Sequence, residues 1–195
     1  MKPGAAKTFS AFGFTQLLMV VAIGFALFLA YDPWRWGQVR EELLAKFPNV
    51  DRIEGAMLER WVAEVKGDPT KVGPQILDVR SEAEYRVSHI PGALHVSVAA
   101  TPEEMHLLPT PEDRAADLRR PIVVCCTVGF DSGEVAGGLK RAGFSRVQML
   151  HGGVFRWGNE RRALVNGGGA VVSVVSVGSS PHSRLLDRSI RARVP

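Results

Sequence analysis

The most strongly patterned part of the chain is an uncharged run close to its N-terminus. Residues 8–31 contain no charged side chain and are mostly apolar. As a helix, such a run is about 36 Å long, which is enough to cross a bilayer with some tilt. Trp34 and Trp36 follow it, where amphipathic rings favour the membrane interface. The pattern therefore predicts one transmembrane helix over residues 9–31, after an N-terminal tail of residues 1–8.

A cleaved signal peptide is the alternative for this segment. Lys2 and Lys7 would form its basic region, but the apolar run is long for such a peptide, and residues 27–30 lack the usual pair of small residues. Basic residues are nearly balanced on the two sides of the run, so the positive-inside rule does not fix an orientation. We therefore expect a single-pass membrane protein that contacts the lipid bilayer through residues 9–31.

The next segment, residues 32–70, is predicted to form a helical arm between the membrane and the main domain. Residues 37–47 have helical character. Between residues 50 and 65 apolar side chains recur every four positions and share one helix face: Ile53, Met57, Trp61 and Val65. A Gly-Asp-Pro sequence at residues 67–69 ends this helix.

Strands and helices alternate over residues 71–165. Short apolar runs predict strands over residues 75–79, 94–98, 121–125 and 147–150. The helices expected between and after them are a turn capped by Ser81 and Glu84, a helix over residues 111–118, a helix capped by Ser132, and a helix that carries Phe155, Trp157 and Leu164. This alternation indicates an α/β domain with a mainly parallel sheet, in which ligands bind beyond the carboxyl ends of strands.

The run over residues 121–125 leads directly to the candidate nucleophile, Cys126. A short loop from Cys126 to Asp131 then enters the helix capped by Ser132. Loop N–H groups and a helix N-terminus favour a thiolate over a thiol, which is how a protein builds a sulfur nucleophile. Cys125 points to the opposite face of the strand and is expected to pack in the core. Asp131 is a negative charge where an anion site favours a positive one.

Composition restricts the remaining chemistry. The chain has two cysteines, adjacent in sequence, which disfavours a disulfide, and its five histidines show no metal-ligand spacing. We expect no metal and no cofactor. The net charge of +4 comes largely from residues 166–195, predicted to be a Gly/Ser/Arg-rich tail that is either solvated or in contact with anionic headgroups. No aromatic residues lie among its arginines, so nucleic-acid binding is not expected.

Three stretches, taken in order, resemble the rhodanese family. They span about residues 72–165, roughly half of the chain. The first is Leu77-Asp78-Val79-Arg80, followed by Glu84-Tyr85 and His89-Ile90-Pro91-Gly92-Ala93; the second is Val123 to Ser132; the third is Gly143-Phe144 with Val147, Leu150, Gly152-Gly153 and Trp157.

The resemblance implies a five-stranded parallel sheet flanked by helices, and sulfurtransferase chemistry. Cys126 would take sulfane sulfur from a small donor such as thiosulfate, hold it as a persulfide, and pass it to a thiol acceptor. The loop formed by Thr127, Val128, Gly129, Phe130, Asp131 and Ser132 would hold the anionic sulfur. Asp78 and Arg80 are candidates for supporting this loop.

The chain departs from the family at Asp131, where many active members carry an arginine. A carboxylate there favours the protonated thiol and repels thiosulfate, so we expect weak turnover of that donor. A catalytically inactive interaction module, with an unidentified protein partner, is the alternative. Phosphatases of the same fold have a loop one residue longer with an arginine for the oxyanion, and this loop has neither feature.

Overall fold

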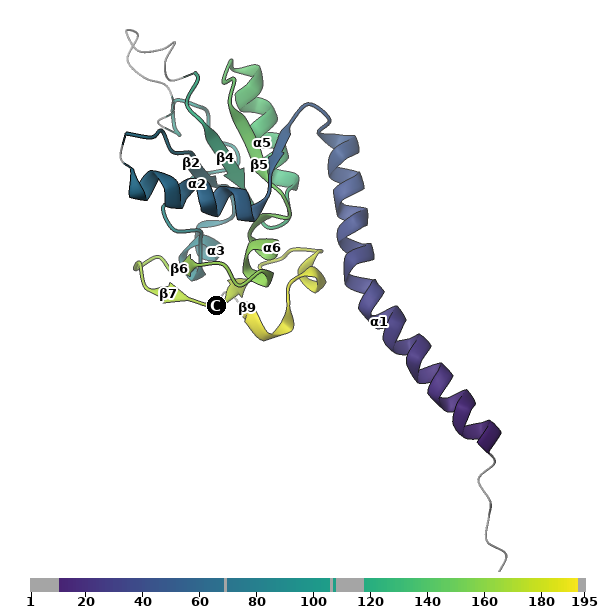
Figure 1. Cartoon of the computed structure of the whole chain (residues 1–195). Coiled ribbons are helices and arrows are strands. Elements are labelled where there is room, and N and C mark those ends of the chain that lie inside the picture. The colour runs from purple at the N-terminus through teal and green to yellow at the C-terminus, as the bar shows by residue number, and fades with distance from the viewer. Residues whose placement is uncertain (1–10, 69, 106, 108–117, 193–195) are drawn as a thin grey trace, which may run out of the picture. The chain divides into compact units, whose positions relative to one another are not determined.

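The computed structural model describes residues 11–68, 70–105, 107 and 118–192 (Figure 1). The chain divides into two compact units, Met1–Gln38 and Val39–Pro195. The predicted N-terminal tail of residues 1–8 and the predicted helix over residues 111–118, apart from its last residue, lie outside the described residues.

A parallel sheet of five strands forms the centre of the second unit. Its strand order is β1-β5-β4-β2-β3, with β1 Asp51–Ile53, β2 Gln75–Asp78, β3 Leu94–His95, β4 Ile122–Cys125 and β5 Val147–Leu150. All four neighbouring pairs are parallel. The central strand β4 is fully buried, which explains its unbroken apolar, β-branched sequence. The α/β architecture and the parallel sheet of five strands are as predicted.

Helices separate the strands. They are α2 Gly55–Gly67, α3 Glu82–Val87, α5 Phe130–Arg141 and α6 Gly153–Asn159. Figure 1 shows α2 crossing one face of the sheet, and α5 packs against β4 and β5. The predicted capping box at the start of α3 is present, with Ser81 and Glu84 bonding each other's backbone N–H.

The connections leave β2 and β4 in opposite directions. From β2 the chain passes through α3 to β3 at one edge, whereas from β4 it passes through α5 to β5 on the other side. Such a switch point opens a crevice beyond the carboxyl ends of the two strands, and ligands bind there in open α/β sheets. Cys126 follows the end of β4 and therefore lies at this crevice.

Helix α1, Ala11–Lys46, is longer than the sequence predicted. The side chains of residues 11–15, 17 and 25–33 are not described. Among the helices as far as they are described, none has the length and apolar character that crossing a lipid bilayer requires. The predicted transmembrane helix over residues 9–31 is therefore not supported; the backbone is helical from residue 11, but α1 continues past Tyr31 through charged positions to Lys46.

The predicted helical arm over residues 32–70 differs from the structure. Residues from Val39 onward belong to the same compact unit as the sheet. Residues 51–53, predicted to start a helix, instead form β1, because they pair in parallel with residues 148–150 of β5. The helix that follows is real and begins at Gly55. Three paired residues are too few for strand periodicity to stand out against the helical pattern beside them.

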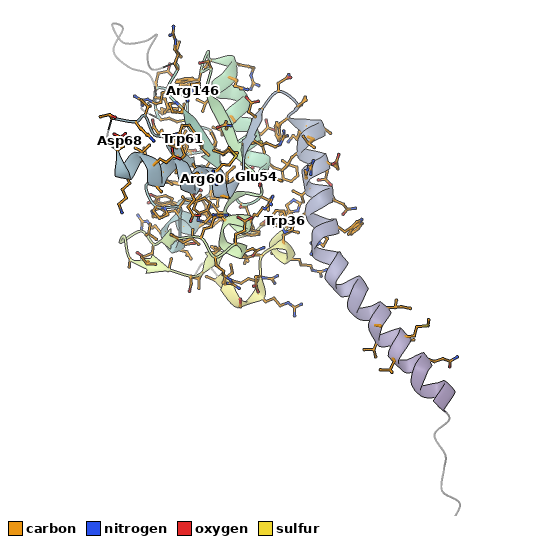
Figure 2. The ribbon with its side chains drawn as sticks, viewed as in Figure 1. Trp36, Glu54, Arg60, Trp61, Asp68 and Arg146 are labelled. Carbon is orange, nitrogen blue, oxygen red and sulfur yellow. The ribbon has the colours of Figure 1, made fainter. Side chains whose placement is uncertain are left out.

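Polar side-chain contacts hold α2 at its N-terminal end and at its middle. Glu54 lies just before the helix (Figure 2), with its carboxylate 2.5 Å from His151 Nδ1 and 3.3 Å from the guanidinium of Arg156 on α6. The indole N–H of Trp61 donates to the Val72 carbonyl at 3.2 Å. These contacts join α2 to the β5–α6 connection on one side and to the segment before β2 on the other.

The predicted C-terminal tail over residues 166–195 is a packed part of the second unit as far as residue 192. It forms β7 Val171–Val172, β8 Val175–Ser176, two 3₁₀ turns at Ser183–Leu185 and Arg188–Ile190, and β9 Arg191–Ala192. Strand β7 pairs with β6 Leu164–Val165, and β8 with β9. Buried apolar residues hold the segment in place, namely Val175, Leu185, Leu186 and Ile190. Leu164, predicted on the last helix, belongs to β6.

Candidate active site

Cys126 stands at the point where the buried strand β4 becomes a loop. Only 1% of the surface of Cys126 is exposed, and Cys125 before it is fully buried. The Val79 amide donates to the Cys125 carbonyl at 2.9 Å, so the neighbouring strand β2 holds the strand end in register. The predicted nucleophile therefore lies on rigid backbone at the base of the crevice.

Hydrogen bonds from the first turn of α6 hold the loop that begins at Cys126. The amides of Val154 and Phe155 donate to the carbonyls of Cys126 and Thr127 at 2.9 and 3.1 Å. Gly153 permits this approach: its φ is +57°, and a Cβ there would collide with the Cys126 carbonyl and lie 2.5 Å from that of Thr127. Only glycine tolerates both that backbone conformation and that closeness.

Helix α5 begins earlier than predicted. Its N-cap is Gly129, with φ of +137°, and Phe130 is its first residue, so Ser132 lies within the first turn and does not cap it. The Ser132 hydroxyl donates to the Gly129 carbonyl at 3.0 Å and lies 3.5 Å from Cys126 Sγ. The non-helical part of the predicted loop is thus limited to Cys126 through Gly129.

Two opposing influences act on the Cys126 thiol. Burial raises its pKa and is the largest cause, and the nearby Asp131 carboxylate raises it further. Hydrogen bonds from the Ser132 hydroxyl and from the Ser132 and Gly129 amides lower it, the Gly129 amide lying 3.2 Å from Sγ. The net pKa is raised, so the resting group is a thiol. The hydrogen bonds expected to stabilise a thiolate are present, but burial raises the pKa by more than they lower it.

Cys126 opens onto a pocket of about 460 Å³. The predicted loop residues Thr127, Val128, Phe130 and Asp131 line it, whereas Gly129 and Ser132 are buried against the sulfur. Asp131 is exposed in the first turn of α5, where its charge also complements the helix N-terminus.

Sequence reasoning missed the opposite walls of this pocket. They are formed by Lys46 at the end of α1, Glu84 of α3, and residues 179–182 from the C-terminal segment. The His182 ring stacks on Phe130, with centroids 5.3 Å apart. These residues are distant in sequence from the loop, and no local pattern connects them to it.

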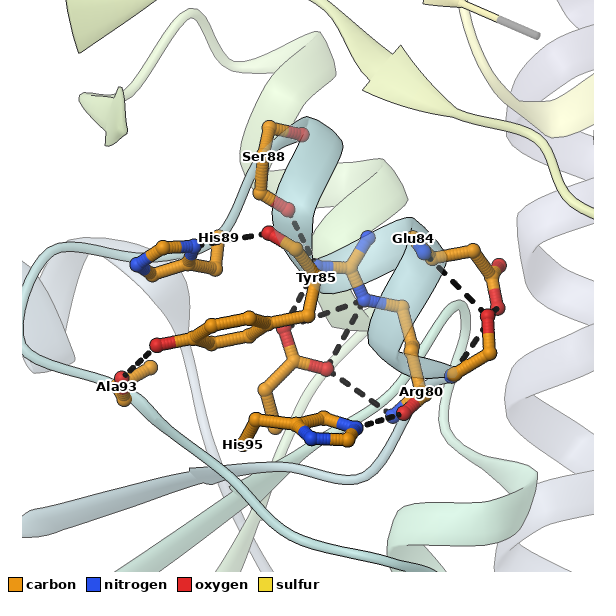
Figure 3. Close-up of polar contacts among 9 residues, drawn as sticks. Arg80, Glu84, Tyr85, Ser88, His89, Ala93 and His95 are labelled. Carbon is orange, nitrogen blue, oxygen red and sulfur yellow. Dashed lines mark hydrogen bonds and ion pairs between the residues drawn. The ribbon is translucent and has the colours of Figure 1, made fainter. Parts of the chain in front are cut away.

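Asp78 and Arg80 form a buried pair beside the site and not in it. Arg80 donates to both Asp78 carboxylate oxygens and, at 2.6 Å, to the Ser88 carbonyl (Figure 3). His95 Nε2 lies 2.8 Å from the Arg80 carbonyl. Asp78 pairs in the sheet with Cys125, one residue before the nucleophile. The two residues predicted to support the loop thus organise the β2–α3 turn next to it.

The Tyr85 ring packs within the same turn. It stacks on His89 with centroids 3.8 Å apart, contacts His95, and donates its hydroxyl to the Ala93 carbonyl at 2.8 Å (Figure 3). The motif residues after β2 therefore shape the wall of the crevice that carries Glu84.

The fold and site define a class of α/β proteins in which a cysteine follows the central parallel strand and enters a helix through a short loop. Comparisons with known proteins identify the family. A model of the rhodanese-like domain matches residues 60–160. This chain therefore belongs to the rhodanese-like domain family.

Curated relatives cover a similar part of the chain. The thiosulfate sulfurtransferase GlpE of Pseudomonas fluorescens is 33% identical over 96 residues, which are 49% of this chain and 81% of that protein. The protein of the same name from Coxiella burnetii is 35% identical over 100 residues, 51% of this chain and 81% of that protein. A crystal structure of a rhodanese-like domain protein from Staphylococcus aureus is 20% identical, with a TM-score of 0.44, and covers 55% of this chain and 91% of that one.

Proposed function

We propose that the protein is a sulfurtransferase that moves sulfane sulfur through a persulfide on Cys126. The observation that carries this proposal is the position of Cys126 at the base of a pocket, with the Gly129 amide 3.2 Å from its sulfur. That amide and the Ser132 hydroxyl stabilise negative charge on sulfur. The sulfurtransferase names of the curated relatives support the same chemistry.

The sulfur transfer is a pair of displacements at sulfur. The Cys126 thiolate attacks the outer sulfur of the donor, and for thiosulfate the S–S bond breaks with sulfite as the leaving group. A thiolate acceptor then attacks the outer sulfur of the persulfide, and the Cys126 thiolate leaves with the electron pair of the broken bond. No external oxidant or reductant is needed.

Intact mass spectrometry after incubation with thiosulfate or inorganic polysulfide tests the proposal. Loading should add the mass of one sulfur atom to the wild-type protein and none to Cys126→Ser. A Cys125→Ala variant is the matched control, because that neighbouring thiol faces the core. Loading that persists in Cys126→Ser would contradict the proposal.

Thiosulfate is proposed to be a poor donor for this protein. Residues 127–132 contain no basic side chain, and Asp131 lines the pocket that a dianion must enter. Lys46 also lines the pocket, but its ammonium pairs with Glu134 at 2.8 Å. The pocket thus offers thiosulfate little compensating positive charge.

A catalytically inactive interaction module is the second candidate. The burial of Cys126 and the raised pKa of its thiol favour it, because a nucleophile must be both accessible and ionised. Absence of a sulfur adduct with both thiosulfate and polysulfide, in protein that is shown to be folded, would select this candidate.

We also propose that the N-terminal unit attaches the protein to a lipid bilayer. The support is the uncharged sequence over residues 9–31 and the exposure of Leu18, Met19, Val20 and Ile23 on α1. Crossing of the membrane has no support from the described helices. Ultracentrifugation of a cell lysate tests attachment, because recovery of all the protein in the supernatant, with none in the membrane pellet, would contradict it.

A further inference from the structure

The pocket that holds Cys126 carries an unusual set of charges for a site that binds anionic sulfur compounds. Its lining includes two carboxylates, Glu84 and Asp131, and one ammonium, Lys46. The ammonium is engaged by Glu134 from outside the pocket. Negative charge therefore predominates around the nucleophile.

The two carboxylates differ in the hydrogen bonds and ion pairs that they already make within the protein. Glu84 accepts from the Ser81 amide and hydroxyl, at 3.2 and 2.5 Å, and serves the capping box. Asp131 is exposed, and within the described part of the chain its carboxylate has no ion-pair partner. Asp131 is thus the carboxylate available to a ligand. Its charge acts on the Cys126 thiol and raises the pKa of that group.

We infer that the site prefers a sulfur acceptor that bears a protonated amine near its thiol, with Asp131 as the specificity-determining residue. This inference rests on the proposed sulfurtransferase function. A compact aminothiol places its ammonium two carbons from the reacting sulfur, and a pocket of about 460 Å³ admits such a molecule. The Asp131 carboxylate attracts that ammonium while the thiolate attacks the persulfide.

The reaction is the transfer of one sulfur atom. The aminothiol thiolate forms a new S–S bond with the outer sulfur of the Cys126 persulfide, and the bond between that sulfur and Cys126 Sγ breaks. Sγ leaves as a thiolate with the bonding electrons, and the product is the persulfide of the aminothiol. The amine is neither consumed nor deprotonated, and its role is to orient the acceptor.

Two small thiols with opposite charges separate this effect from intrinsic reactivity. Protein loaded with inorganic polysulfide and freed of excess donor is mixed with cysteamine or with 3-mercaptopropionate, and loss of the sulfur adduct is followed by intact mass. The informative quantity is the ratio of the two rate constants. Intrinsic thiol reactivity cancels when this ratio is compared between wild type and variants.

Asp131→Asn should lower the cysteamine to 3-mercaptopropionate ratio by up to about fivefold, the upper end of what losing one exposed charge interaction costs. Asp131→Glu should keep most of the preference. Glu64→Gln is the matched control, because that half-exposed carboxylate on α2 pairs with Lys71 and does not line the pocket. Its ratio should equal that of the wild type.

The possible outcomes separate the inference from the function on which it rests. An unchanged ratio in Asp131→Asn, with the persulfide formed and discharged normally, overturns the amine preference and leaves the sulfurtransferase proposal intact. Failure of the wild type to form any adduct overturns both. A ratio that falls equally in Glu64→Gln assigns the preference to the overall charge of the protein and overturns the role of Asp131.

Discussion

At the residue scale, Cys126 combines features of a buried structural thiol with those of a nucleophile. Burial raises the pKa of the thiol, and Asp131 adds to this, whereas the Gly129 amide and Ser132 lower it. The Ser132 hydroxyl can donate either to the Gly129 carbonyl or to a thiolate on Cys126. A rotation of this hydroxyl therefore lets it donate to the thiolate that forms when the cysteine ionises.

The raised pKa predicts the pH dependence of cysteine reactivity. Alkylation of Cys126 by iodoacetamide should rise with pH and reach its midpoint above the pKa that is usual for a free cysteine, because burial raises the pKa of this thiol. Asp131→Asn should move the midpoint down, because it removes a negative charge near the sulfur. Peptide mapping distinguishes Cys126 from Cys125. A midpoint at or below the usual value in the wild type would show that the hydrogen bonds outweigh burial.

Reversal of the charge at residue 131 tests the proposed weakness with thiosulfate. Asp131→Arg should raise kcat/KM for thiosulfate about tenfold, because a repulsion on a dianion becomes an attraction. The gain should shrink at high ionic strength, since the group is exposed. Steady-state thiocyanate formation measures it, and an unchanged rate would show that Asp131 does not limit this donor.

At the element scale, the last turn of α1 packs against the start of α5. Leu43 and Phe47 are buried there, and a Cβ on Gly129 would lie 2.7 Å from Leu43 Cδ1. Arg52 donates to the Leu43 and Phe47 carbonyls at 2.8 and 3.2 Å and so satisfies the carbonyl end of α1. The loop that follows Cys126 is thus covered by a segment that precedes the residues matched by the family model.

Gly133 of α5 is the residue on which this packing depends. A Cβ at this position would collide with the Phe47 ring and lie 2.8 Å from its Cγ. Alanine favours a helix by about 1 kcal/mol over glycine, but overpacking costs about 1–3 kcal/mol. We therefore expect Gly133→Ala to lower the free energy of unfolding by about 1 kcal/mol, measured by urea denaturation.

A second glycine on the same helix is the control for that prediction. At Gly138 an added Cβ meets only Arg141 at 3.8 Å, so Gly138→Ala should stabilise the protein by about 1 kcal/mol. Equal effects of the two substitutions would contradict the close packing of Phe47 on α5.

The sequence predicted those elements whose periodicity covers enough residues. The strands β2, β4 and β5 and the helix after Cys126 were expected because their apolar runs are bounded by capping and turn residues. Strand β1 was missed because only residues 51–53 pair with β5. The sequence predicts that α5 starts at Ser132, because serine is a favourable capping residue. In the structure the helix starts directly after Gly129, whose φ is positive.

At the scale of the whole molecule, the C-terminal segment completes the domain. Asn159 donates to the Leu185 carbonyl at 2.7 Å and accepts from the Asp187 amide at 2.8 Å. Asp187 also pairs with Arg161 at 2.5 Å. These contacts place residues 179–182 at the pocket wall. Composition alone could not show this, because a glycine- and serine-rich sequence is also typical of unpacked tails.

Leu186 tests whether the segment is packed as the structure shows. Its side chain is almost fully buried, so Leu186→Ala should lower the free energy of unfolding by about 2–5 kcal/mol. Val171→Ala, at a residue that is 81% exposed, should change it little. Thermal and urea unfolding measure both variants. Near-equal stabilities would indicate a tail that does not pack on the domain.

The candidate site could be predicted in part because its chemistry is local. Cys126 and its loop are contiguous in sequence, so their place after a central strand followed from the pattern. Lys46, Glu84 and His182 come from three distant segments, and only tertiary packing brings them to the pocket. The balance between burial and hydrogen bonding at the sulfur likewise depends on atoms that the sequence does not place.

The most direct test of the central claim is a single transfer of sulfur from Cys126. Protein loaded with inorganic polysulfide, freed of excess donor and mapped by peptide mass spectrometry, should carry the added sulfur on Cys126 and not on Cys125. Addition of cyanide should then release one equivalent of thiocyanate and restore the free thiol. Sulfur found elsewhere in the chain, or a Cys126 adduct that releases no thiocyanate, would contradict the assignment of Cys126 as the sulfur carrier.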